Sequence, residues 1–192
     1  RNIDRTWMAW IVTMACYAPL YTGIWSLWFS FKGSFFNDPF MKPWIAVFSE
    51  HAMILYAIGI GIIISELLHL WGEAILGIRS SNLTNRGVIT NGPFRYLRHP
   101  IYLSKCIGWA LIFVPFVDGY SPLECVRLTI LFAGICLIYY LRSITEERML
   151  SEDPDYVAYA LWVDKNGWLA WAGRRCPVLT FAWRHAHWHK AK

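Results

Sequence analysis

The sequence predicts an all-α integral membrane protein, a single domain over residues 1–192 with about four transmembrane helices, a C-terminal helical hairpin and cytoplasmic amphipathic segments. Of the 192 residues, 56% are hydrophobic and only 16% are charged, whereas soluble domains have about 45–50% and 25%. The mean hydropathy is +0.34. Long apolar runs approach the roughly 20 residues that a helix needs to cross a bilayer. This composition excludes an ordinary cytosolic domain and an intrinsically disordered chain.

Four segments are predicted to span the membrane. The first, Trp7 to Phe31, contains no charged residue and has tryptophans at both ends, which suit the two membrane interfaces. The second runs from about Trp44 to Leu70 and has an uncharged centre. The third, Ile101 to Val117, and the fourth, Leu123 to Leu141, are shorter. The compact turn at 118–122 predicts that these two form an antiparallel hairpin.

The distribution of basic residues predicts which side faces the cytoplasm. With four spans, the N-terminus, the loop of about 71–100 and the tail from Arg142 share one side, and they contain most of the 18 Lys and Arg residues. Basic loops remain in the cytoplasm, so both termini are predicted to be cytoplasmic. Basic loops facing anionic lipid also explain the net charge of +5, and nucleic-acid binding is not expected.

The loop before the third span carries the first cluster of chemically active residues. Residues 91–93 (N-G-P) are a strong turn signal, and Pro100 suits the first turn of the helix that follows. Two arginines, a histidine and two tyrosines crowd this helix entrance: Arg95, Tyr96, Arg98, His99 and Tyr102. Such residues often anchor a loop at the membrane interface. The alternative interpretation is a site that binds a carboxylate or phosphate through arginine.

The second cluster follows the fourth span, at residues 142–150 (R-S-I-T-E-E-R-M-L). If the helix continues, Arg142 and Glu146 are four residues apart and share a face. Ordinary ion pairs at a solvated helix end are one interpretation. However, acidic residues are costly at a membrane boundary and are commonly retained for function.

An amphipathic helix is predicted after this cluster. Asp153 and Pro154 suit the N-cap and the first helical position, and three aromatic residues follow: Tyr156, Tyr159 and Trp162. We expect this helix to lie on the membrane surface.

No metal site is predicted. The five cysteines include no C-x-x-C pair, so neither a zinc site nor a disulfide framework is indicated. The run at 185–189 (H-A-H-W-H) has no Cys or carboxylate beside it and is interpreted as a solvent-exposed interfacial tail. Glu66, His69 and Glu73 share a helical face, but the second Glu-x-x-His of a di-iron bundle is missing. A polar interface is predicted there, with a contribution to an active-site wall as the alternative.

The two clusters together resemble a known family. Residues 92–103 (G-P-F-R-Y-L-R-H-P-I-Y-L) are similar to the G-P-[YF]-R-x-x-R-H-P-x-Y segment of the isoprenylcysteine carboxyl methyltransferases and their bacterial relatives. Residues 142–150 are similar to the R-x-x-x-E-E-x-x-L segment of the same family, in the same order and across the expected hairpin. Tyr156, Tyr159 and Pro177 are similar to its Y-x-x-Y…P pattern. The resemblance covers roughly residues 70–178.

The resemblance implies a membrane methyltransferase that binds S-adenosylmethionine on the cytoplasmic side. Residues 71–178 would form the methyltransferase-like region, between the two N-terminal spans of 1–70 and a His/Trp-rich tail at 179–192. The cofactor pocket implied by position comprises Arg95, Arg98, His99, Pro100, Tyr102, Arg142, Glu146 and Glu147. The candidate catalytic residues are Arg98, His99 and Glu147. Arginine suits the methionyl carboxylate, and a carboxylate suits the ammonium or ribose hydroxyls; which glutamate faces the cofactor is left open.

The implied acceptor is lipophilic or membrane-delivered, for example a prenylated substrate, with a carboxylate, amine or thiol as the methylated group. A carboxylate needs no general base, whereas a thiol or an ammonium does, and His99 or a glutamate is the candidate. Departures from the family pattern point to altered substrate access or to lost catalysis. They are Lys105, the aromatic segment Trp168 to Trp171, and the chain past Pro177.

Two alternative functions remain. A non-catalytic subunit could keep this fold within a larger membrane assembly, since the twelve tryptophans and the two weak spans suit burial against partner helices, lipids or pigments. An NADPH-dependent reductase related to the membrane sterol reductases ranks lower, because those enzymes have Asn where Pro100 stands here.

Overall fold

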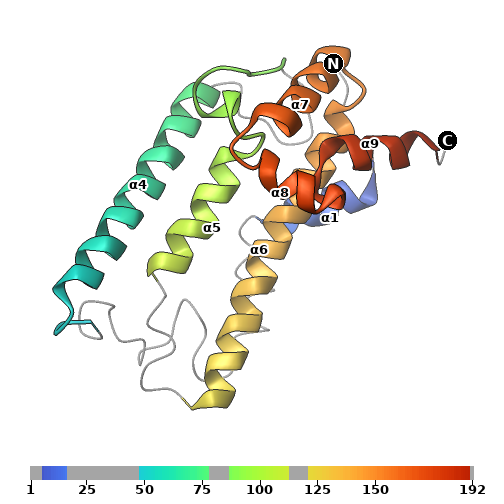
Figure 1. Cartoon of the computed structure of the whole chain (residues 1–192). Helices are drawn as coiled ribbons and strands as arrows, with labels where there is room; N and C mark the ends of the chain where they lie inside the picture. The colour runs from blue at the N-terminus through green and yellow to red at the C-terminus, as the bar shows by residue number, and fades with distance from the viewer. Residues whose placement is uncertain (1–5, 17–47, 78–86, 113–120, 191–192) are drawn as a thin grey trace.

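The structure is a computed structural model that describes residues 6–16, 48–77, 87–112 and 121–190 (Figure 1). Within these ranges the fold is all α, as predicted, and contains no strand. Its elements in chain order are α1 (Trp7–Ala15), α4 (Ala52–Leu76), the 3₁₀ helix η2 (Gly92–Arg95), α5 (Pro100–Ile112), α6 (Pro122–Leu150), α7 (Pro154–Asn166), α8 (Ala170–Arg175), the 3₁₀ helix η4 (Pro177–Leu179) and α9 (Phe181–Lys190).

In the part of the chain that the structure describes, two helices are long and apolar enough to cross a membrane. They are α4, with a mean hydropathy of 2.0, and the Cys125–Leu150 part of α6, with a mean hydropathy of 1.7. In the most apolar 18 residues of each helix, only 6% and 12% of the residues are buried inside the protein. The core helix of a soluble protein would be mostly buried, so this exposure supports the prediction of a membrane protein.

The four predicted spans are described only in part. The nine residues of α1 are too few to cross a bilayer, and residues 17–31, 44–47 and 113–120 lie outside the described residues. Helix α4 continues beyond the predicted end at Leu70 to Leu76. Helix α6 continues from Leu141 to Leu150, because residues 142–150 contain neither Gly nor Pro. The membrane orientation stays a prediction.

Helices α4 and α5 pack side by side along their length (Figure 1). Glycines allow this close approach: a Cβ on Gly72 would lie 2.7 Å from Ile101 Cγ1, and one on Gly108 would lie 2.9 Å from Ser65 Oγ. Small residues at helix contacts are typical of membrane proteins. This packing fixes the start of α5, where Pro100 is buried beside Gly72.

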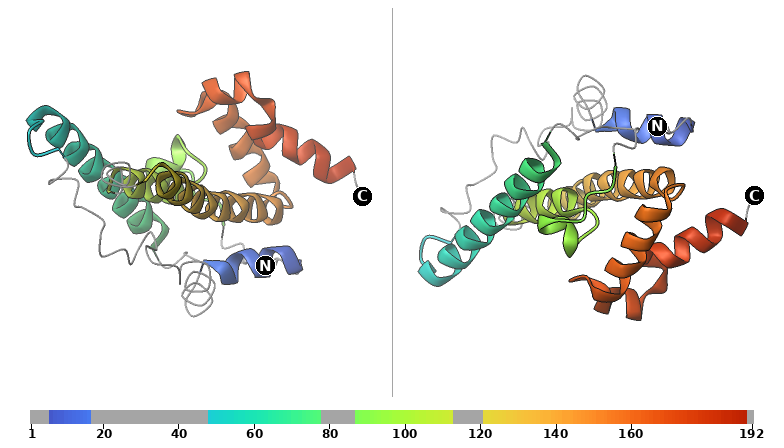
Figure 2. Two further views of the ribbon diagram at one scale, coloured as in Figure 1. Left: turned by 90° about the horizontal axis from the view of Figure 1, so that it is seen from below. Right: turned by 90° about the horizontal axis from the view of Figure 1, so that it is seen from above.

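Residues 151–190 form a C-terminal lobe that contains α7, α8, η4 and α9. Figure 2 shows the lobe and α1 on opposite sides of α6. The core of the lobe consists of Tyr156, Ala160 and Phe181, which joins α7 to α9. As predicted, Asp153 caps α7, accepting a hydrogen bond from Asp155 N at 3.0 Å.

The tyrosines of α7 contact other parts of the protein: Tyr156 is buried, and the Tyr159 hydroxyl donates to the Phe94 carbonyl at 2.5 Å. Trp162 on the same helix is 44% exposed, and the position of α7 on a membrane surface stays a prediction. The run at 185–189, interpreted as an exposed tail, lies in α9. There His187 is exposed, whereas Trp188 is partly buried against the core of the lobe, which corrects the interpretation in part.

Candidate functional site

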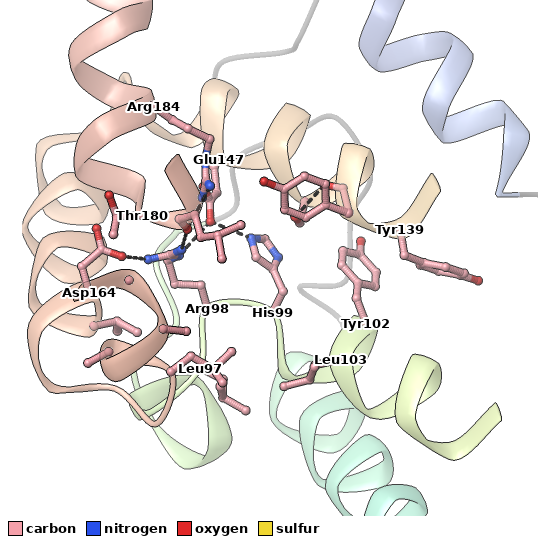
Figure 3. Close-up of a pocket in the computed structure, with 18 of the residues that line it drawn as sticks. Leu97, Arg98, His99, Tyr102, Leu103, Tyr139, Glu147, Asp164, Thr180 and Arg184 are labelled. Carbon is pink, nitrogen blue, oxygen red and sulfur yellow. Dashed lines mark hydrogen bonds and ion pairs between the residues drawn. The ribbon is translucent and has the colours of Figure 1, made fainter. Parts of the chain in front are cut away.

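The chain turns sharply just before α5, and this turn places the first cluster. Gly92 has a φ of +57°, a conformation that favours glycine, and a Cβ there would lie 3.0 Å from Ile75 Cγ1. The 3₁₀ helix η2 follows, and Arg98 and His99 then stand directly before the first residue of α5. Their side chains extend toward the C-terminal part of α6 (Figure 3).

Glu147 of α6 is the centre of the site. Its side chain is 1% exposed, and three side chains surround its carboxylate, two from the loop before α5 and one from α9. Arg98 Nε donates to Oε1 at 2.8 Å, and His99 Nε2 lies 3.2 Å from the same oxygen. Arg184 of α9 donates to Oε2 from Nη2 at 2.5 Å and from Nε at 3.2 Å. A buried charge is stable only with such compensation, so these partners keep Glu147 ionised.

Asp164, near the end of α7, extends the cluster. One of its oxygens forms an ion pair with Arg98 Nη1 (Figure 3), and the other accepts a hydrogen bond from the Ala182 backbone N at 2.9 Å. The second contact is at the start of α9, where a carboxylate also interacts favourably with the helix dipole. Arg98 and Asp164 therefore link the loop before α5 to both α7 and α9.

Glu146 belongs to a neighbouring cluster on the other side of His99. Its Oε1 accepts a hydrogen bond from the Tyr102 hydroxyl at 2.5 Å and from Arg142 Nε at 3.1 Å. His99 Nδ1 lies 3.7 Å from Glu146 Oε2, so the imidazole stands between the two glutamates. The His99 and Tyr102 rings are stacked at 5.7 Å, and the Arg142 guanidinium lies 5.3 Å from the centre of the Tyr102 ring.

A cavity of about 310 Å³ opens beside Glu147. Its polar end is lined by Arg98, His99, Glu147, Asp164 and Arg184. Its other walls are mostly aromatic, apolar or thiol side chains of α5 and α6, with small residues of α8: Tyr102, Leu103, Cys106, Cys136, Tyr139, Tyr140, Ala170 and Gly173. The volume is at the lower end of the roughly 300–1,000 Å³ usual for small-molecule sites.

Charges in the two clusters balance. Three arginines (Arg98, Arg142 and Arg184) are paired with three carboxylates (Glu146, Glu147 and Asp164). Burial opposes the charge on Arg98, but the carboxylates of Glu147 and Asp164 outweigh it and raise the pKa of the guanidinium. The site therefore suits a ligand with charges of both signs better than one with several charges of one sign.

One comparison with known proteins identifies the family. A family model described as "protein of unknown function (DUF1295)" matches residues 44–164, more than half of the chain. The chain belongs to the DUF1295 family. This family is membrane-associated and belongs to the steroid 5-alpha reductase-like group. Searches of curated proteins and of solved structures each found no significant match.

The DUF1295 region contains every predicted site residue, but the structure separates them into groups. Arg98, His99, Tyr102 and Glu147 line the cavity, which makes Glu147 the glutamate that faces it. Arg142 and Glu146 lie behind Tyr102 and reach the cavity only through it. Pro100 is buried at the start of α5 against α4. Arg95 is exposed beside Tyr96, in a separate shallow depression next to Tyr159, and does not reach the cavity.

The other polar residues singled out in the sequence lie away from the cavity. Glu66, His69 and Glu73 on α4 do not line it. His187 of the tail is exposed and stacks on Trp183 at 3.8 Å. Within the described parts of the chain, no group of three His, Cys, Asp or Glu side chains is placed to hold a metal ion.

Two residues of the site were missed in the sequence, Asp164 and Arg184. The DUF1295 match ends at Asp164, and Arg184 lies beyond it. A signal for Arg184 does exist: Phe181 and Trp188 are three residues before it and four after it, which is the spacing of one helix face. That face is the one that α9 packs against the lobe.

Proposed function

We propose that this DUF1295 protein binds S-adenosylmethionine in the cavity and transfers its methyl group to a lipophilic or membrane-delivered acceptor at the cytoplasmic membrane face. The observation that carries the proposal is the buried, charge-balanced cluster around Glu147 at one end of a cavity whose walls are aromatic and apolar. The motif resemblance to the isoprenylcysteine carboxyl methyltransferases supports the same assignment.

The residues present fit this cofactor. S-adenosylmethionine carries a carboxylate, an ammonium and a sulfonium, so it needs partners of both signs. Arg98 and Arg184 offer guanidinium donors for the carboxylate, and Glu147 and Asp164 offer acceptors for the ammonium and the ribose hydroxyls. The ring of Tyr139, which lines the cavity, suits a cation, as aromatic rings attract positive charge.

The bound cofactor would supply an activated methyl group, and the protein would orient the reactants and exclude water. The stacked rings of His99 and Tyr102, each held by a glutamate, give the cavity a rigid wall. The aromatic lining keeps water from the reacting atoms. His99 is the residue placed to hold a proton from a thiol or ammonium acceptor, and a carboxylate acceptor needs no such base.

The acceptor is proposed to be lipophilic because the side of the cavity formed by α5 and α6 is lined by apolar and thiol side chains. Leu103, Cys106 and Cys136 line it there, on helices whose outward faces are apolar and exposed. Each methylene that a prenyl or acyl chain buries in such a site contributes about 0.8 kcal/mol.

NADPH-dependent reduction is a second candidate, favoured by membership of the steroid 5-alpha reductase-like group. The electrostatics of the site argue against it. NADPH carries several phosphate charges and would need a surplus of basic groups, whereas the arginines here are matched by carboxylates.

The test is binding of S-adenosylhomocysteine to the purified protein in lipid nanodiscs, measured by calorimetry. We expect micromolar binding by the native chain and at least about tenfold weaker binding by Arg98→Gln, equivalent to about 1.4 kcal/mol. Arg148→Gln is the matched control, since Arg148 is an exposed arginine next to Glu147. If the folded native protein does not bind S-adenosylhomocysteine, the proposed methyltransferase function is refuted. Binding of NADPH instead would establish the reductase, and binding of neither would favour the non-catalytic subunit.

A further inference from the structure

We propose that the outward side of the segment around α8 is a binding surface for anionic phospholipid headgroups. This α8 surface consists of Trp168, Leu169, Trp171, Arg174, Arg175 and Val178. The proposal concerns the lobe rather than the reaction, and it does not depend on which cofactor the cavity binds.

The first observation is the exposure of large apolar side chains. Trp168 and Trp171 are each 54% exposed, Leu169 is 49% exposed and Val178 is 48% exposed, all within eleven consecutive residues. Soluble surfaces seldom gather so many large apolar groups in one place, and such a patch marks an interaction site. Tryptophan in particular is enriched where a protein meets the membrane–water interface.

The second observation is the charge of the same segment. Arg174 and Arg175 are both exposed, and residues 168–179 contain no acidic residue. The Arg175 guanidinium lies 5.8 Å from the centre of the Trp171 ring, so one cation stands beside the aromatic group that would enter the interface. Aromatic residues combined with paired arginines suit an anionic lipid surface, since adjacent basic residues are attracted to negatively charged headgroups.

The third observation is that the surface is held in place by contacts on its inner side. The Trp168 backbone N donates to the Tyr96 carbonyl at 3.1 Å, and the two rings stack at 5.3 Å. A Cβ on Gly167, which ends α7, would lie 2.6 Å from Tyr96 O, and one on Gly173 within α8 would lie 2.8 Å from Thr180 Cγ2, so the segment packs closely both before α8 and within it. The exposed side chains are therefore presented on a preformed scaffold.

Position in the fold agrees with a bilayer partner. In Figure 1, α8 lies on the side of the lobe nearer the middle of α6, whereas α7 lies nearer the C-terminal end of α6. Near its middle, α6 exposes apolar side chains such as Leu137. Leu169 of this surface also lines the cavity, together with its neighbours Ala170 and Gly173, so lipid bound to the α8 surface would contact a residue of the cavity wall.

Cys176 provides a probe for this proposal. It is exposed and directly follows α8, whereas the other four cysteines are partly buried. The full chain, labelled at Cys176 with an environment-sensitive fluorophore, is placed in nanodiscs of phosphatidylcholine alone or with phosphatidylglycerol. Each set includes lipids brominated near the headgroup, which quench the fluorophore on contact. The same preparation of Cys176→Ala gives the background.

We expect about twofold more quenching in the anionic nanodiscs, and a loss of this difference in high salt, which screens such contacts. The double variant Arg174→Gln/Arg175→Gln should lose the lipid dependence, whereas Lys165→Gln, which removes an exposed charge from α7, should retain it. Equal quenching in both lipids, or none in either, would overturn the proposal. A label shielded from both brominated lipid and an aqueous quencher would also overturn it, because a protein would then cover the surface.

Discussion

The Arg184 guanidinium contacts one oxygen of the Glu147 carboxylate at two points, from Nη2 at 2.5 Å and from Nε at 3.2 Å. The side chains are 7% and 1% exposed, so the pair is almost completely removed from water. It joins the end of α6 to α9, which lies outside the part of the chain that matches DUF1295. The C-terminal helix is therefore part of the site.

Replacing Arg184 by Ala should destabilise the protein. Glu147 would keep Arg98 and His99 but lose two charged hydrogen bonds in a buried position, and a hydrogen bond to a charged group contributes about 1.5–3 kcal/mol. We expect a loss of about 3–5 kcal/mol in the free energy of unfolding, measured by thermal unfolding in detergent. Arg148→Ala, at an exposed arginine, should change it by less than about 0.5 kcal/mol. Equal effects of the two variants would contradict the structural role of Arg184.

The contact between Arg98 and Glu147 illustrates how far the sequence is informative about the site. The motif of residues 92–103 and that of 142–150 were expected to meet across a hairpin, and the structure brings Arg98, His99 and Glu147 together. The sequence alone could not show which of Glu146 and Glu147 faces the cavity. Adjacent residues on a helix point about 100° apart, and the rotation of α6 depends on packing against elements far away in the chain.

The C-terminal lobe shows why the packing of α7 and the position of Arg184 could not be predicted. The tyrosines of α7 suit a membrane surface as well as a protein core. The sequence of an amphipathic helix does not show whether its apolar face packs against lipid or against another helix. The partner of α7 is Phe181 of α9, in the part of the chain past Pro177 that departs from the family pattern. Once α9 is placed, Arg184 comes near Glu147, but no spacing in the sequence connects residues that are 37 positions apart.

Glu146→Gln and Glu147→Gln should separate the roles of the adjacent glutamates. Glu147 lines the cavity and neutralises Arg98 and Arg184. Removing its negative charge should therefore weaken S-adenosylhomocysteine binding by at least about tenfold. Glu146 contacts Tyr102 and Arg142 behind the cavity, and its replacement should weaken binding by less than about threefold. Calorimetry on both variants tests this. A larger effect at Glu146 would show that the ligand lies on the other side of His99.

Gly167→Ala should destabilise the lobe. The added Cβ would lie 2.6 Å from Tyr96 O and 2.7 Å from Val163 O, and neither backbone oxygen can move freely. Such overpacking costs about 1–3 kcal/mol. Gly134→Ala is the matched control in α6, where a Cβ meets nothing within 4 Å and the change should be neutral or slightly stabilising. Thermal unfolding of both variants is the measurement, and a neutral Gly167→Ala would show that the end of α7 packs less closely against Tyr96.

The stability of the lobe should fall in alkaline solution. Burial raises the pKa of Tyr156, and the negative charge of Glu147 raises it further; burial also raises the pKa of Tyr159. An unfolded tyrosine ionises near pH 10. Above that pH the unfolded chain releases protons that the folded chain retains, so the free energy of unfolding falls as the pH rises, whereas below about pH 10 these tyrosines make no difference. Unfolding measured between pH 8 and pH 11 should show this decline, and Tyr156→Phe should reduce its slope because one of the two groups is removed. An unchanged slope in Tyr156→Phe would mean that other groups cause the alkaline loss.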